Sequence, residues 1–250
     1  MAGHSKWANI KRRKGAQDAK RAKVFTKLIK EITVAAKEAG PDPDGNPRLR
    51  LAIQNAKGAN MPKDTIERAI SKGSGADAEE YFDITYEGYA PHGVAVFVEC
   101  TTDNLNRTVA SVRSIFTKNG GSLGKNGSVE FLFDRKGIFS FRRPEHITDE
   151  DSFMLELIDG GVEEVEFDNE NGYVQISTAM EDFGSLQNKL EEMDIETESA
   201  ELQRIPTTTV SLDNEAFLSV IKLIELLEDD DDVAKVYHNL EATDEQMEMV

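Results

Sequence analysis

The sequence predicts an α+β protein: an N-terminal three-helix domain followed by two ferredoxin-like α/β domains, the second inserted into the first. Apolar residues recur at helical spacing over the first quarter of the chain, and strand-like and helix-like segments alternate after it. The order βαββαβ is complete within residues 135–206. A strand–helix–strand pattern is under way before that segment and resumes after it, which indicates an insertion.

The expected domains follow from these patterns. Residues 1–75 form the helical domain, residues 81–134 plus 207–240 form the split ferredoxin-like domain, and residues 135–206 form the inserted one. The polar, glycine-containing stretch Ser71–Glu80 links the first domain to the second.

Three helices are predicted within residues 1–75. The first spans about Ala16 to Ala39, where apolar residues recur every three or four positions, and Gly40-Pro41 ends it. Asn46-Pro47 provides a cap and a first-turn proline for the second helix. Pro62 begins the third helix and Gly73 ends it.

The split domain is predicted from alternating strands and helices. Its strands are expected at Ile84–Tyr89, Val94–Cys100, Ser128–Asp134, Thr207–Leu212 and Val233–His238. A helix over Asn104–Lys118 is expected to turn Leu105, Val109, Val112 and Phe116 inward, and a later helix carries Phe217, Ile221, Ile224 and Leu227. The 128–134 strand is expected to place Val129, Phe131 and Phe133 on one side.

The inserted domain has two predicted helices among four strands. The strands are Gly137–Phe141, Val162–Phe167, Tyr173–Thr178 and Glu196–Leu202, with the turn DNENG between the second and third. Thr148 with Asp151, and Thr178 with Glu181, are predicted to cap the helices. The inward residues are expected to be Phe153, Met154, Leu157 and Ile158, then Phe183, Leu186, Leu190 and Met193.

Charge is distributed very unevenly along the 250 residues, whose formal net charge is −18. Residues 1–75 hold 17 Lys or Arg against 7 Asp or Glu, a net of +10, whereas residues 76–250 hold 12 against 40, a net of −28. The first fourteen residues contain five cations and no acid. A basic segment attracts polyanions and an acidic one is repelled by them, so we expect the N-terminal domain to bind nucleic acid.

The candidate nucleic-acid-binding residues are cations of the N-terminal arm and of the first helix, with one tryptophan. They are Lys6, Trp7, Lys11, Arg12, Arg13, Lys14, Lys20, Lys23, Lys27 and Lys30. A lysine stripe is also typical of a solvated helix face, and the four consecutive cations of the arm favour the binding interpretation. Trp7 suits stacking on a base and packing against the helices equally well.

Glu99, Asp103, Asn104 and Arg107 cluster where a strand ends and are the candidates for a second surface. Capping and pairing at the start of the following helix is the favoured explanation. The acids Asp229–Asp232 are interpreted as a solvated turn rather than a magnesium site. The stretch Gly120–Ser128 is interpreted as a glycine-rich turn, because Asn126 stands where a phosphate-binding loop needs Ser or Thr.

No strong catalytic, cofactor or metal motif is found, so we expect a protein that is not an enzyme and needs no cofactor or metal. Cys100, the sole cysteine, lies in the apolar run VAVFVEC and is expected to be a buried thiol. No apolar run approaches the length of a membrane span, and no secretory signal is recognised, so a cytoplasmic location is expected.

The chain resembles the YebC/PmpR family along nearly its full length. The segments that carry the resemblance are MAGHSKWANIKRRK, KGANMPKDTIERAISKGSG, YEGYAPHGVAVFVECTTDNLNRT and GGSLGKNGSVEFLF. Three positions depart from the family pattern: glycines are usual at Ala90 and His92, and a basic residue is common at Leu105. The resemblance implies three domains, the second split by the third.

The resemblance also implies a function. Members are described as DNA-binding transcriptional regulators of the bacterial cytoplasm, so we expect a regulator that binds DNA. The alternative is a ribosome-associated translation factor that binds ribosomal RNA and relieves stalling, since a mitochondrial relative is described as a translational activator. A metal-dependent nuclease is a minor alternative. The acidic domains would then contact protein partners, and no membrane is involved.

Overall fold

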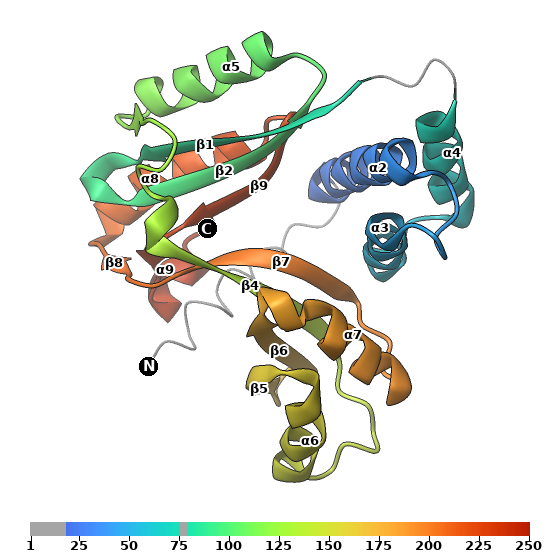
Figure 1. The fold of residues 1–250 in the computed structure, drawn as a ribbon. Helices are drawn as coiled ribbons and strands as arrows, with labels where there is room; N and C mark the ends of the chain where they lie inside the picture. Colours follow the sequence, from blue (N-terminus) through green and yellow to red (C-terminus); the bar gives the residue numbers. More distant parts are fainter. Residues whose placement is uncertain (1–18, 76–79) are drawn as a thin grey trace. The chain divides into compact units, whose positions relative to one another are not determined.

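The computed structural model describes residues 19–75 and 80–250 (Figure 1). Contacts divide these residues into two compact units. Residues 19–30, 80–134 and 206–250 form the first unit, and residues 31–75 and 135–205 form the second. Each unit is described by itself.

The predicted helical region is confirmed. Its helices are α2 (Ala19–Ala39), α3 (Pro47–Gly58) and α4 (Lys63–Ser74). Asn46 caps α3 by accepting a hydrogen bond from the Leu49 amide, and its side-chain amide donates to the carbonyls of Ala35 and Gly40 at the end of α2. This buried asparagine therefore fixes how one helix follows the other.

Gly73 was expected to end the third helix, but α4 continues to Ser74 and Gly73 is buried inside it. A Cβ at this position would lie 2.3 Å from the Thr33 carbonyl oxygen of α2. Glycine is therefore needed for the close approach of two helices rather than for a helix stop.

The first unit contains an antiparallel sheet of order β3-β1-β2-β9. Its strands are β1 (Phe82–Tyr89), β2 (Ala95–Thr102), β3 (Ser122–Leu123) and β9 (Val233–His238), and its main helices are α5 (Leu105–Lys118) and α8 (Asn214–Glu228). Both helices pack on one face, where Phe116 and Phe217 meet Val96, Val98 and Cys100. The short strands β8 (Val210–Ser211) and β10 (Leu240–Glu241) pair beside it, and α9 (Asp244–Glu248) follows.

The predicted strand Ser128–Asp134 is wrong. Residues 128–132 form a bend and a 3-10 turn (Glu130–Leu132), and a strand begins only at Phe133. Val129 and Phe133 are buried against Phe97 on the second face of the sheet, while Phe131 is 71% exposed. The edge position expected for this strand is taken by β3, which follows α5, and the inner position expected for the strand 207–212 is taken by β1, which comes first in the chain but lies between β2 and β3. The sheet thus keeps the ferredoxin-like arrangement with a permuted strand order.

The reason lies in Glu87 of β1. Its buried carboxylate accepts hydrogen bonds from three loop amides, those of Gly127 at 2.6 Å, Val129 at 2.7 Å and Glu130 at 2.9 Å. Amides held by a carboxylate cannot pair with a neighbouring strand. The same contacts explain why this glycine-rich stretch is not a phosphate loop, because its amides already bind an anion.

The second unit contains the inserted sheet, of order β5-β6-β4-β7. Its strands are β4 (Phe133–Arg142), β5 (Val162–Asp168), β6 (Tyr173–Ala179) and β7 (Ser199–Pro206), with helices α6 (Glu150–Leu157) and α7 (Phe183–Glu192). The aromatic residues Phe139, Phe141 and Phe153 and the leucines of α7 form the core. The order is that of a ferredoxin-like domain, as predicted.

Several local expectations in the α/β region are wrong. Met154 and Ile158 are 41% and 59% exposed, because α6 is short and passes into a 3-10 turn after Leu157. Leu105 in the first turn of α5 is also exposed, at 40%. Other differences concern caps and strand limits: Asp149 replaces Thr148 as N-cap, Thr178 stays within β6, and the strands expected at 207–212 and 196–202 are found at 210–211 and 199–206.

His92 lies in the turn between β1 and β2 with φ of 64°. Glycine adopts this left-handed conformation with less strain than other residues. This observation explains why glycine is typical at the position. Ala90 has φ of −72°, so its side chain causes no such strain.

Cys100 is buried, as expected, and burial raises the pKa of its thiol to about 12, with smaller contributions from the charges of Asp230 and Asp232.

We therefore expect the thiol of Cys100 in the native protein to react slowly with an aromatic disulfide reagent at pH 8, and the urea-unfolded protein to react with one equivalent at once. Because the unfolded thiol ionises near pH 9 while the folded one does not, the free energy of unfolding should fall as the pH rises from 9 toward 12. Fast labelling of the native protein would contradict this.

Candidate nucleic-acid interface

Three of the predicted lysines lie on one face of α2, because positions 23, 27 and 30 are separated by four and three residues. All three contact the acidic turn, defined here as Glu228–Asp232, which follows α8. Lys23 Nζ lies 2.5 Å from Asp229 Oδ1, and Lys27 Nζ donates to the Glu228 carbonyl oxygen at 2.9 Å. The acidic turn therefore holds cations that the sequence assigned to nucleic acid.

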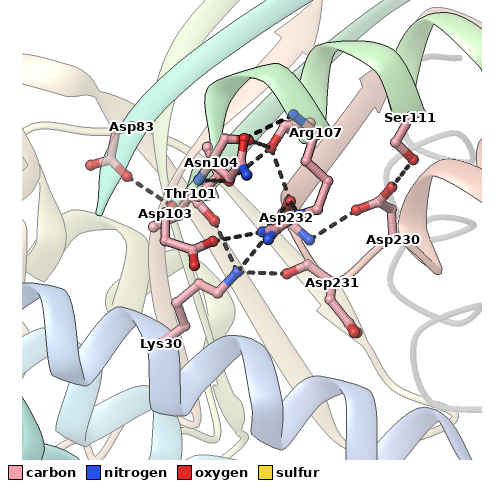
Figure 2. Close-up of polar contacts among 12 residues, drawn as sticks. Lys30, Asp83, Thr101, Asp103, Asn104, Arg107, Ser111, Asp230, Asp231 and Asp232 are labelled. Atoms are coloured by element: carbon pink, nitrogen blue, oxygen red, sulfur yellow. Dashed lines mark hydrogen bonds and ion pairs between the residues drawn. The ribbon is translucent and has the colours of Figure 1, made fainter. Parts of the chain in front are cut away.

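Lys30 is the most deeply placed of the three. Its ammonium group donates to the carbonyl oxygens of Thr101 at 2.9 Å and Asp231 at 2.8 Å, and lies 3.4 Å from Asp232 Oδ1 (Figure 2). The side chain is 16% exposed, compared with 41% for Lys23. The three lysines are thus held to different degrees, with the deepest at position 30.

Asp232 is the centre of this polar cluster. The guanidinium of Arg107 donates to both of its carboxylate oxygens, from Nε at 2.9 Å and from Nη2 at 2.8 Å, and Thr108 Oγ1 lies 2.9 Å from Oδ2 (Figure 2). Burial of Asp232 opposes its ionisation, but the hydrogen bonds from Arg107 and Thr108 and the charge of Lys30 outweigh burial and lower its pKa. The carboxylate is therefore ionised at neutral pH.

Asp230 completes the turn. Its side chain accepts a hydrogen bond from the hydroxyl of Ser111 on α5 and another from the backbone amide of Asp232 at 2.9 Å (Figure 2). Asp232 is buried and Asp230 is half-buried, whereas Asp229 and Asp231 are exposed. The prediction of a solvated turn therefore fits Asp229 and Asp231 and is wrong for Asp232.

The four candidates for a second surface have different positions. Asn104 is the N-cap of α5 and accepts from the Arg107 amide, and Asp103 pairs with Arg107 at 2.6 Å. Glu99 lies on β2, opposite Thr85 of β1 and Lys235 of β9, and is not one of the hydrogen-bond donors to Asp232. Asp103, Asn104 and Arg107 thus cap and pair at the start of α5, which is the role favoured from the sequence.

Other predicted residues fall outside the described part of the chain. They are Lys6, Trp7, Lys11, Arg12, Arg13, Lys14 and the side chain of Lys20. The sequence shows how strongly charge is concentrated there: residues 1–30 hold ten Lys or Arg against one acid, a net of +9, and residues 31–75 hold seven against six, a net of +1. The basic character of the first domain therefore resides in residues 1–30.

Sequence reasoning missed the acceptor Asp232 and the hydroxyl donors Thr108 and Ser111 of this cluster. A usable signal was present. Asp232 directly precedes a strand, where a side chain next to buried residues is often buried, and Arg107 stands in the first turn of a helix expected to pack on the same sheet. Those facts together suggest an ion pair, but they do not give the partner.

Within the ranges 19–75 and 80–250, no group of three or more His, Cys, Asp or Glu residues is arranged to hold a metal ion. None of the helices described there combines the length and the apolar character needed to cross a membrane. The cluster around Asp232 consists of paired cations and anions, and its chemistry is that of a structural polar network.

Residues 5–76 match the family model described as "TACO1/YebC protein N-terminal domain", and residues 81–240 match "TACO1/YebC second and third domain". The chain belongs to the YebC family. A protein of Amoebophilus asiaticus is 62% identical over 240 residues, covering 96% of this chain and 98% of the relative. A protein of Persephonella marina is 50% identical over 252 residues, covering all of both chains. Both relatives carry the name "Probable transcriptional regulatory protein".

A solved structure of the same fold is the crystal structure of a conserved hypothetical protein, Aq1575, from Aquifex aeolicus. It aligns with a TM-score of 0.78 and 44% sequence identity, covering 91% of this chain and 93% of that one. The α+β architecture of this YebC family member is therefore shared with an experimentally determined structure. The names given to its relatives describe regulatory proteins.

Proposed function

We propose that this protein is a non-enzymatic regulator of transcription that binds DNA through the cations of its N-terminal segment. The observation that carries the proposal is the concentration of charge, a net of +9 in residues 1–30 of a chain whose net charge is −18. A segment of this charge gains affinity by releasing counterions from a nucleic-acid backbone. The names of the relatives support a role in transcription.

The candidate cations differ in how far their contacts within the protein leave them accessible. Lys30 is enclosed by Thr101, Asp231 and Asp232, so its ammonium group is already coordinated. The remaining candidates of the first thirty residues are then the arm cations together with Lys20, Lys23 and Lys27 of α2, and the side chain of Lys23 is 41% exposed. Phosphate contacts of this kind position a protein on nucleic acid but do not read its sequence.

A specific observation favours a second candidate, a translation factor that binds ribosomal RNA. Helix α3 carries Arg, Gln and Asn, the residue types that read base edges in the major groove. However, Gln54 donates to Thr197, and Asn55 exchanges hydrogen bonds with the backbone of Ala200 at 3.0 and 2.9 Å. Because these amides bond within the second unit, they are not available to read base edges of DNA. Recognition of folded RNA by a basic segment does not need such a helix.

One experiment separates the two candidates. The full-length protein is purified from cells in low salt, and the nucleic acid that accompanies it is sequenced. Promoter fragments are the expected result for a transcriptional regulator. Ribosomal RNA, together with sedimentation of the protein alongside ribosomes, would replace the first candidate with the second. Cleavage of either nucleic acid by the protein with magnesium or manganese would contradict the non-enzymatic assignment.

A further inference from the structure

The carboxylates of the acidic turn Glu228–Asp232 repel one another, and the lysines of α2 reduce this repulsion. Four consecutive carboxylates follow the C-terminus of α8, where the helix dipole is already negative. Repulsion among these charges destabilises the turn unless cations lie nearby. Lys23, Lys27 and Lys30 supply three ammonium groups, and one of them binds the carbonyl oxygen of Glu228 at the helix end.

The contact of Lys23 is more exposed to solvent than that of Lys30. The Lys30–Asp232 pair is 16% and 7% exposed, and Arg107 holds the same carboxylate. The Lys23–Asp229 pair is 41% and 58% exposed, and exposed pairs contribute little to stability and are screened by salt. One end of the lysine face is therefore fixed, and the other end is held by a contact that an outside anion can replace.

A nucleic-acid phosphate and an aspartate carboxylate offer the same chemistry to an ammonium group, because both are anionic oxygen acceptors. A phosphate reaching Lys23 would meet Asp229 as a competitor already in place. Glu228 and Asp231, both exposed, would also repel the phosphate backbone. The turn thus lowers the number of cations that a bound nucleic acid can contact.

We propose that the acidic turn is an autoinhibitory element that occupies Lys23 through the carboxylate of Asp229, and that nucleic acid gains a contact with this lysine only by displacing that carboxylate. The proposal rests on the proposed nucleic-acid-binding function and concerns the regulation of that same site. Lys30, Asp230 and Asp232 stay in place in both states, and Lys27 keeps its bond to the backbone carbonyl of Glu228. The contact that exchanges is the exposed one of Lys23.

The test neutralises the exposed acids and keeps the buried ones. In the full-length protein Glu228→Gln, Asp229→Asn and Asp231→Asn are combined, and binding to a short DNA duplex and to a ribosomal RNA fragment is measured over a range of salt concentrations. One additional phosphate contact, at Lys23, should steepen the slope of log affinity against log salt by about 1 unit on DNA. Affinity at low salt should rise about tenfold or more.

The matched control changes the same net charge elsewhere. Glu145, Glu156 and Glu192 are exposed acids with no interaction described for them, and they are replaced together by glutamine. An unchanged labelling rate of Cys100 shows that the first unit remains folded in either variant. Adding Lys23→Gln should weaken binding by the acidic-turn variant more than binding by the wild type.

The outcomes are distinguishable. A steeper slope and tighter binding for the acidic-turn variant than for the control support autoinhibition. Equal binding by the two variants would overturn it, while salt-dependent binding by the wild type would leave the proposed function intact. If no form of the protein bound either nucleic acid even in dilute buffer, both the autoinhibition and the proposed function would be overturned.

Discussion

Replacing Lys11, Arg12, Arg13 and Lys14 together by alanine is expected to reduce the slope of log affinity against log salt on DNA by up to about 3–4 units. Each cation that contacts a phosphate releases close to one counterion, and four are removed. If the plots of log affinity against log salt for the wild type and the variant meet near 1 M salt, the affinity of the variant at 0.1 M salt is lower by roughly three orders of magnitude. Fluorescence anisotropy with a labelled duplex measures both quantities.

The matched control for this variant removes four cations from the described helices. Arg50, Lys57, Lys63 and Arg68 are exposed on α3 and α4 and can be replaced by alanine with little effect on helix propensity. Both quadruple variants change the net charge by the same amount. An equal loss of slope in the control would place the interface on the helices, and an unchanged slope in the arm variant would show that the arm does not contact phosphate.

The second large effect is expected at Asp232, which two cations share. Asp232→Asn preserves the shape of the side chain but removes the charge that Arg107 and Lys30 bind. Hydrogen bonds to a charged group contribute about 1.5–3 kcal/mol each. In the variant, Arg107 and Lys30 would lose their charged acceptor at position 232 and retain only their other partners. We expect the free energy of opening of the first unit to fall by about 2–3 kcal/mol.

Cys100 provides the measurement, since it is the sole cysteine and is buried in the core of the first unit. Labelling of a buried thiol requires opening, so its rate under native conditions reports the opening free energy. A loss of 2–3 kcal/mol corresponds to labelling that is roughly 30 to 150 times faster. Asp229→Asn, at an exposed pair, is the control and should change the rate less than about fivefold. If Cys100 of the Asp232→Asn variant were labelled at the wild-type rate, a stabilising role of Asp232 would be refuted.

The pH dependence has a definite sign. The folded-state pKa of Asp232 lies below its ordinary value of 3.8, so the stabilisation is complete above that value and is lost as the pH falls through the folded pKa. The difference in stability between the wild type and Asp232→Asn should be constant between pH 7 and about pH 5 and should shrink below about pH 4. Urea unfolding followed by circular dichroism at each pH tests this.

The fold class could be predicted because its signals are local. Apolar spacing located α2, α5, α7 and α8, because each helix buries one face and its sequence must have the matching period, and short apolar runs bounded by turn residues located β1, β2, β6 and β9. The strand expected at 128–134 shows the limit of this approach. Val129 and Phe133 are buried as alternation requires, but Glu87, forty residues earlier, holds the amides that a strand would need.

The candidate site likewise has one part that the sequence predicts and another that it does not. The excess of cations in residues 1–30 is a property of composition, and the sequence alone determined it. Which lysines are occupied depends on residues about two hundred positions away, because Lys27 contacts Glu228 and Lys30 contacts Asp231. Local periodicity carries no information about such pairs.

The sequence by itself therefore determined the main helices and most of the strands, the inserted domain, the buried thiol and the contrast between a basic start and an acidic remainder. Only the tertiary structure decided that the acidic turn faces the lysines of α2, and that Asp232 is the buried partner of Arg107 and Lys30. The physical reason is that secondary structure and net charge arise from neighbouring residues. Ion pairing and burial depend instead on which distant segments the fold brings together.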